Sequence, residues 1–170
     1  MKNLIVGLCA CLITLPVLAA DPVAAVVIGE EVPFSNKDAV DGAIVAECNL
    51  PQRQAQLLVE QLKAAGIETS QEKNLTPKAG ANVLKLEIAT AVSGGNAFTG
   101  HSKFVTVTGI LFQNGKEAGK FVATRKSGGG AFGGYKGSCA VLGRCAQAIG
   151  KDIAGWLKSP VDGAKLGDAR

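Results

Sequence analysis

The sequence predicts an α+β domain in which one mixed sheet carries two long helices on the same face. Three observations support this fold class. A helical stripe of apolar residues follows Pro51, β-rich runs flank Asn114-Gly115, and a second helical stripe lies between Val141 and Leu157. The predicted order is strand, helix, three-stranded meander, helix. We therefore expect a single domain over residues 21–158, without an internal repeat or a linker.

The first part of the chain predicts one strand and one helix. The β-branched run AAVVIG, inside the segment from Asp21 to Phe34, is typical of a strand, and residues 35–48 are interpreted as a loop. Asn49 is a good N-cap, and Pro51 is tolerated in the first turn of the helix that follows. The apolar positions of this helix recur at helical spacing at Ala55, Leu58, Leu62 and Ala65. Gly66 predicts its left-handed C-cap.

The middle of the chain predicts the meander. Residues 68–81 are polar and contain Pro77, so they are interpreted as a loop, and residues 93–101 as a flexible connection. The alternation of residues 83–90 predicts a half-buried strand. Residues 103–112 and 120–125 flank Asn114-Gly115, which is the strongest short-range signal for a hairpin.

The last predicted helix combines an apolar stripe with a face of small residues. The stripe consists of Val141, Leu142, Cys145, Ile149, Ile153, Trp156 and Leu157, and the small face of Gly143, Ala146, Gly150 and Ala154. Each interior glycine, including Gly155, costs about 1 kcal/mol relative to alanine, so close packing has to compensate. Residues 159–170 are polar and predict a flexible tail.

The expected topology places the starts of the two helices side by side. A right-handed crossover makes the first and second strands parallel, and the meander makes the fourth strand parallel to the second. Both helices then run back antiparallel to those strands on one face of the sheet. Cys48 precedes the first helix and Cys139 begins the second.

The N-terminus predicts export. Lys2, an apolar run and the small residues before Ala19 and Ala20 are typical of a signal peptide, cleaved after one of these two alanines. The run of about 15 residues is short for a membrane span, which needs roughly 20. Only ten residues precede Cys11 and the apolar run continues after it, which argues against lipid anchoring there. We therefore expect residues 1–20 to be removed and the protein to be periplasmic.

Three cysteines remain after cleavage, and an oxidising compartment favours a disulfide between two of them. The topology favours Cys48–Cys139, with Cys48–Cys145 as the second choice. Cys139 and Cys145 are about 9 Å apart if both lie in a helix, and this pair requires a turn over residues 140–144. We interpret the disulfide as a structural crosslink; a redox or metal-binding role of the cysteines is the alternative.

The remaining motifs argue against several functions. The basic residues are scattered, with no patch for nucleic acid. Gly128-x-Gly130-x-x-Gly133 matches a dinucleotide fingerprint, but no later strand carries the acidic ribose ligand, so no cofactor is expected. His101 completes a Cys₃His set with the cysteines, but no C-x₂-C spacing supports a metal site. We find no catalytic motif, and Asp152 is interpreted as a solvated or capping charge.

The glycine-rich loop before the last helix is the predicted partner-binding segment. It contains Gly130, Phe132, Gly133, Tyr135 and Lys136. Aromatic side chains on such a loop can contact a partner, and they can equally pack over the edge of the sheet.

From Leu84 through Leu157 the pattern resembles a group of small bacterial envelope proteins of unknown function. A meander strand, an Asn-Gly hairpin, a Ser-Gly-Gly-Gly run and a helix closing with KDIAGWL carry the resemblance. It implies a domain related to the N-terminal domain of TolB and to the CsgG and LpoB type, whose members act in assembly and sometimes form rings. The expected function is a non-enzymatic binding or accessory module for an envelope protein, with self-assembly as an open question. The alternative is a small-ligand or metal-binding protein that uses His101 and the cysteines.

Overall fold

The protein folds around one mixed sheet of six strands in the order β2-β1-β3-β4-β5-β6. The computed structural model describes residues 21–96, 100–127 and 137–170. The strands are β1 Ala25–Gly29, β2 Glu68–Glu72, β3 Asn82–Asn96, β4 Gly100–Gln113, β5 Lys116–Ser127 and β6 Ala164–Gly167. The helices are α1 Gly42–Glu47, α2 Leu50–Ala64 and α3 Ser138–Trp156, with a 3₁₀ helix at Lys37–Ala39. The α+β class is therefore confirmed.

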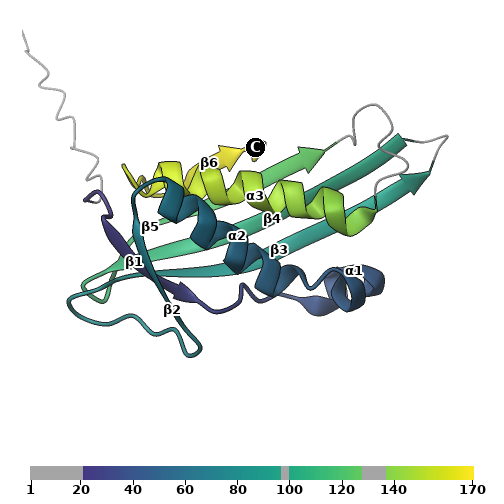
Figure 1. Ribbon diagram of the computed structural model, residues 1–170. Coiled ribbons are helices and arrows are strands. Elements are labelled where there is room, and N and C mark those ends of the chain that lie inside the picture. Colours follow the sequence, from purple (N-terminus) through teal and green to yellow (C-terminus); the bar gives the residue numbers. More distant parts are fainter. Residues whose placement is uncertain (1–20, 97–99, 128–136) are drawn as a thin grey trace, which may run out of the picture.

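The two long helices lie across the same face of the sheet (Figure 1). β1 pairs in parallel with β2 and β3, while β3, β4 and β5 form the antiparallel meander that the sequence predicts. Apolar side chains from the helices and from this face make one core. We call this side of the sheet the covered face and the opposite side the uncovered face.

Helix α2 follows Asn49 and stops before Gly66, as its sequence predicts, but Asn49 has φ +43° and its side chain makes no capping hydrogen bond. Ala55, Leu58 and Leu62 are fully buried. At the C-terminus Gly66 has φ +77°, and the Ile67 amide donates to the Leu62 carbonyl at 2.9 Å. This pattern is a Schellman motif, which satisfies carbonyls that the helix itself leaves unpaired.

Helix α3 packs along α2 through its small residues. A Cβ at Gly150 would lie 3.3 Å from the Leu58 Cα, and one at Gly143 would lie 2.7 Å from the Arg53 Nε. The Gln54 side-chain amide donates to the Ala146 carbonyl at 3.3 Å. In these contacts, later residues of α2 meet later residues of α3. The two helices therefore run parallel and their N-termini are adjacent, as expected.

The hairpin between β4 and β5 turns at Asn114 and Gly115, which have φ of +53° and +79°. Both residues therefore adopt the left-handed conformation that this turn requires. The pairing of β3 with β4 continues to Asn96 and Gly100. The interpretation of residues 93–101 as a flexible connection is therefore wrong for residues 93–96, which belong to β3, and for residues 100–101, which belong to β4.

The segment 35–48, interpreted as a loop, contains two short helices. The Asn36 side chain caps the 3₁₀ helix by accepting from the Asp38 amide, and the Asp41 side chain caps α1 by accepting from the Ala43 amide at 2.8 Å. Ile44 buries its side chain against the core. The helices are too short for a periodic pattern, so their caps were their main sequence signal.

Both edge strands were missed. Glu68–Glu72, interpreted as part of a loop, is β2 and pairs in parallel with β1. The predicted flexible tail contains β6, which pairs in parallel with β5. β2 is polar and β6 has only four residues, so neither shows the alternation that identifies a strand. Pairing with a neighbouring strand stabilises them.

Candidate functional site

The starts of α2 and α3 are joined by the Cys48–Cys139 disulfide. The two Cα atoms lie 5.0 Å apart, and 91 residues separate the cysteines in sequence. This is the first of the pairings considered from the sequence. A stable disulfide is typical of proteins that mature outside the reducing cytosol.

Cys145 is the free cysteine among the described residues, and it is buried in the core. Burial raises the pKa of its thiol, because the apolar surroundings disfavour the thiolate. A buried thiol of this kind is a weak nucleophile. Neither alternative disulfide through Cys145 is present.

The glycine-rich loop lies outside the described residues. Gly130, Phe132, Gly133, Tyr135 and Lys136 are among residues 128–136, so the partner-binding role of this loop stays a prediction. Gly137, the described residue that follows it, is the N-cap of α3.

The potential metal ligands singled out in the sequence are distributed as follows. His101 is a residue of β4, paired in register with Gly95 of β3. Cys48 and Cys139 are joined to each other. Within the described ranges, no three His, Cys, Asp or Glu side chains form a group that could hold a metal ion.

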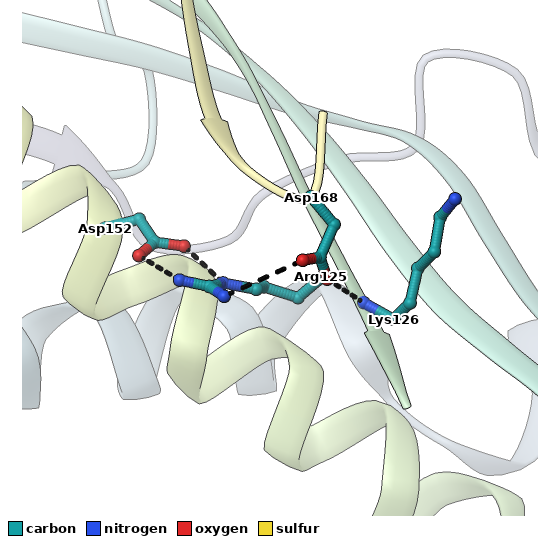
Figure 2. A network of polar contacts seen from close by, with 4 residues as sticks. All are labelled: Arg125, Lys126, Asp152 and Asp168. Carbon is teal, nitrogen blue, oxygen red and sulfur yellow. Dashed lines mark hydrogen bonds and ion pairs between the residues drawn. The ribbon is translucent and has the colours of Figure 1, made fainter. Parts of the chain in front are cut away.

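Asp152 of α3 forms the principal ion pair of the covered face (Figure 2). The Arg125 guanidinium on β5 donates to both Asp152 carboxylate oxygens, each at 2.6 Å. These hydrogen bonds raise the pKa of Arg125. Asp168, which follows β6, lies 4.0 Å from Arg125 and accepts a hydrogen bond from the Lys126 amide at 2.9 Å. These contacts link α3 and the residue after β6 to β5. The Asp152 carboxylate therefore stabilises the packing of α3 on the sheet.

The uncovered face contains a groove with a volume of about 430 Å³ over β3, β4, β5 and β6. Its apolar floor includes Ile110 and Phe112 of β4, which are half-buried, and Val122 of β5, which is 41% exposed. Cross-strand register sets Ile110 beside Lys120 and Val122 beside Lys165. Small-molecule and side-chain pockets in proteins commonly have this volume.

Charged side chains line the rim of this groove. Three are lysines and one is a glutamate: Lys85, Lys120, Lys165 and Glu87. Lys120 also lies 3.7 Å from Glu117, but both side chains are about half exposed, so this pair is weak. The groove therefore combines an apolar floor with a mainly basic rim.

These residues were not singled out from the sequence, although β4 carried a signal. In KFVTVTGILF, Phe104, Ile110 and Phe112 alternate with the core residues and face the other side. A strand with apolar residues on both faces has a second surface to bury. Only the placement of β3 and β5 beside β4, and of β6 beside β5, shows that this surface is a groove.

Comparisons with known proteins identify the fold. No family model matches the chain, and no curated protein matches it. A solved Xanthomonas campestris protein of the DUF330 family is 11% identical, with a TM-score of 0.53 over 82% of this chain and 87% of that one. A PelC dodecamer from Paraburkholderia phytofirmans is 15% identical, with a TM-score of 0.50 over 84% and 92%.

A minor lipoprotein from Acinetobacter baumannii is 12% identical, with a TM-score of 0.49 over 83% of this chain and 97% of that one. At such identities the likeness concerns the fold alone. The resemblance to TolB, CsgG and LpoB stays a prediction. Among the described residues, no helix combines the length and the apolarity that crossing a membrane requires.

Proposed function

We propose that this chain is a non-enzymatic accessory module of the bacterial cell envelope, which binds an acidic protein through its uncovered face. The observation that carries the proposal is the groove over β3–β6, with its apolar floor and three lysines on its rim. An apolar centre with a polar rim is the usual composition of a protein interface. Export is supported by the predicted signal peptide and by the Cys48–Cys139 disulfide.

The shape and charge of the groove favour this class of partner. Ile110, Phe112 and Val122 form a floor, so an inserted side chain of a partner reaches them, whereas a flat lipid surface does not. Three rim lysines against one glutamate favour an acidic surface. The same excess of lysine disfavours face-to-face packing of two copies, because like charges would meet.

Self-assembly through other surfaces is the second candidate. It is supported by the similarity in fold to PelC, whose solved form is a dodecamer. Light scattering of the purified mature protein distinguishes the two candidates. A mass that is a multiple of the chain supports self-assembly, and a monomer that requires a second protein for its larger form supports the acidic partner.

Charge substitutions at Val122 test the role of the groove. Val161 is a matched control, because it is 44% exposed compared with 41% for Val122 and does not line the groove. Chemical crosslinking in the envelope is followed for Val122→Glu, Val122→Lys and the same two changes at Val161. We expect Val122→Glu to reduce the crosslinked complex at least about tenfold and Val122→Lys to reduce it less, since an acidic partner repels only the former.

The identity of the crosslinked protein completes the test. Mass spectrometry should find a partner whose crosslinked segment is acidic. Equal crosslinking of Val122→Glu and Val161→Glu would exclude the groove as the contact surface. Stronger loss with lysine than with glutamate would exclude an acidic partner.

A further inference from the structure

Lys103 is a buried cation on the covered face of β4. Lys103 is only 7% exposed. In the sheet it is paired with Ser93 of β3 on one side and with Ser127 of β5 on the other. Removing an ammonium group from water is strongly unfavourable unless a counter-charge and hydrogen bonds replace the water. The surroundings of this side chain are therefore informative.

Among the described residues, no carboxylate lies within ion-pair distance of Lys103. Its Nζ donates to the Ser138 Oγ at 3.5 Å, the outer limit of a hydrogen bond. None of the ion pairs between described residues involves Lys103. The three segments outside the described residues supply no counter-charge either, because residues 1–20, 97–99 and 128–136 contain no aspartate or glutamate.

The Lys103 ammonium points at the start of α3, where the helix dipole is positive. Gly137 is the N-cap and no side chain caps the first turn. The Ala140 and Val141 amides donate to the Gly137 carbonyl, which leaves the amides of Ser138 and Cys139 without a partner among the described residues. A cation beside a positive helix end is a repulsive arrangement, and an anion in contact with both would offset the repulsion.

Ser93 adds an independent unsatisfied donor. It pairs with Lys103 in register, so the two side chains share a face of the sheet. Its Oγ is buried and has no hydrogen-bond partner among the described residues. A buried hydroxyl without a partner is uncommon and often marks the position of a missing ligand or water.

We propose that Lys103, Ser93, Ser138 and the first free amides of α3 form a binding site for a tetrahedral oxyanion, either free phosphate or the phosphate group of a larger molecule. The ammonium supplies charge, and the hydroxyls and amides supply hydrogen bonds. Gly137 and Ser138 are exposed, so an anion can enter from solvent. The disulfide holds Cys139, and with it one of the amides, in place. This site is separate from the groove and does not depend on the proposed partner.

Thermal unfolding of the mature protein in inorganic phosphate tests the site. For a dissociation constant of about 1 mM, about 50 mM phosphate should raise the Tm of the wild type by roughly 5 °C relative to sodium chloride of equal ionic strength. Lys103→Met keeps most of the side-chain volume and should abolish this difference. Lys126→Met removes a neighbouring lysine that is exposed on the other face, and it should retain the full difference.

A second variant tests the helix start. Ser138→Pro removes the hydroxyl and one amide, and proline is well accepted at the first position of a helix, particularly after the extended Gly137. Isothermal titration should show at least about tenfold weaker phosphate binding than in the wild type. Titration with glycerol phosphate separates the two sources, since tighter binding than inorganic phosphate identifies an organic phosphate as the ligand.

Two results would overturn the site. One is a phosphate-dependent Tm difference in Lys103→Met equal to that of Lys126→Met, which would be a general salt effect on stability. The other is the absence of phosphate binding by the wild type in the calorimeter.

Discussion

The two faces of β4 differ in what their side chains do. On the covered face, Val105, Val107 and Leu111 are fully buried beneath the helices. On the uncovered face, Ile110 and Phe112 are half-buried and border a groove with lysines on its rim. Neighbouring residues of one strand therefore serve different purposes. The covered face stabilises the fold, whereas the uncovered face leaves apolar surface exposed in the groove that we propose as the partner site.

The largest expected effect compares Leu111 with its neighbour Ile110. Leu111→Ala should destabilise the protein by about 2–5 kcal/mol, because it leaves a cavity in a fully packed site. Ile110→Ala should cost only about 1 kcal/mol, since its side chain is half in water already. Urea unfolding of both variants measures the difference. Equal losses would mean that the uncovered face is part of the folding core.

The disulfide lies on the covered face, but it should stabilise the whole domain. Replacing Cys48 and Cys139 together by serine should cost about 2–4 kcal/mol, because the bond closes a long loop in the unfolded chain. Unfolding with and without a reductant measures this. The wild type should be sensitive to reductant and the double variant insensitive, since Cys145 is then the one cysteine left after removal of residues 1–20. Equal sensitivity in both would show that the reductant acts on stability by a route other than the Cys48–Cys139 bond.

Alanine substitutions at two glycines of α3 distinguish the effect of packing against α2 from the effect of helix propensity. A Cβ added at Gly155 would meet no atom within 4 Å, so Gly155→Ala should gain up to about 1 kcal/mol. Gly150→Ala should be less stable than Gly155→Ala by about 1–3 kcal/mol, because its methyl group meets the α2 backbone. Thermal or urea unfolding of the pair decides this. A Gly150→Ala variant as stable as Gly155→Ala would show that the helices separate easily.

The smallest expected effect on stability comes from placing a thiol on each face of the sheet. The two thiols should nevertheless differ clearly in their rates of alkylation. Burial raises the pKa of Cys145, so less thiolate is present at pH 8 than for an exposed cysteine. In Val122→Cys, the new thiol should react with iodoacetamide at least about tenfold faster than Cys145. Mass spectrometry of the alkylated peptides gives both rates in one sample. Similar rates would show that the covered face opens frequently.

The predictions from sequence succeeded where the signal was local and strong. The α2 stripe ending at Gly66, the Asn114-Gly115 turn and the α3 stripe each depend on residues close in sequence. The Cys48–Cys139 pairing followed from the handedness of the crossover, which is itself a local property of strands and helices. The lysines of the groove carried no such signal, because each lies on a different strand.

The sequence by itself determined the meander, the two long helices and their common direction, because hydrophobic periodicity and turn residues act over a few positions. Only the tertiary structure decided that the polar segment 68–72 and the short segment 164–167 become edge strands, since their hydrogen bonds depend on a neighbour already in place. It also decided which lysines surround the groove, and that Lys103 faces the start of α3 across the covered side. These arrangements depend on contacts between residues far apart in sequence, and no local pattern encodes them.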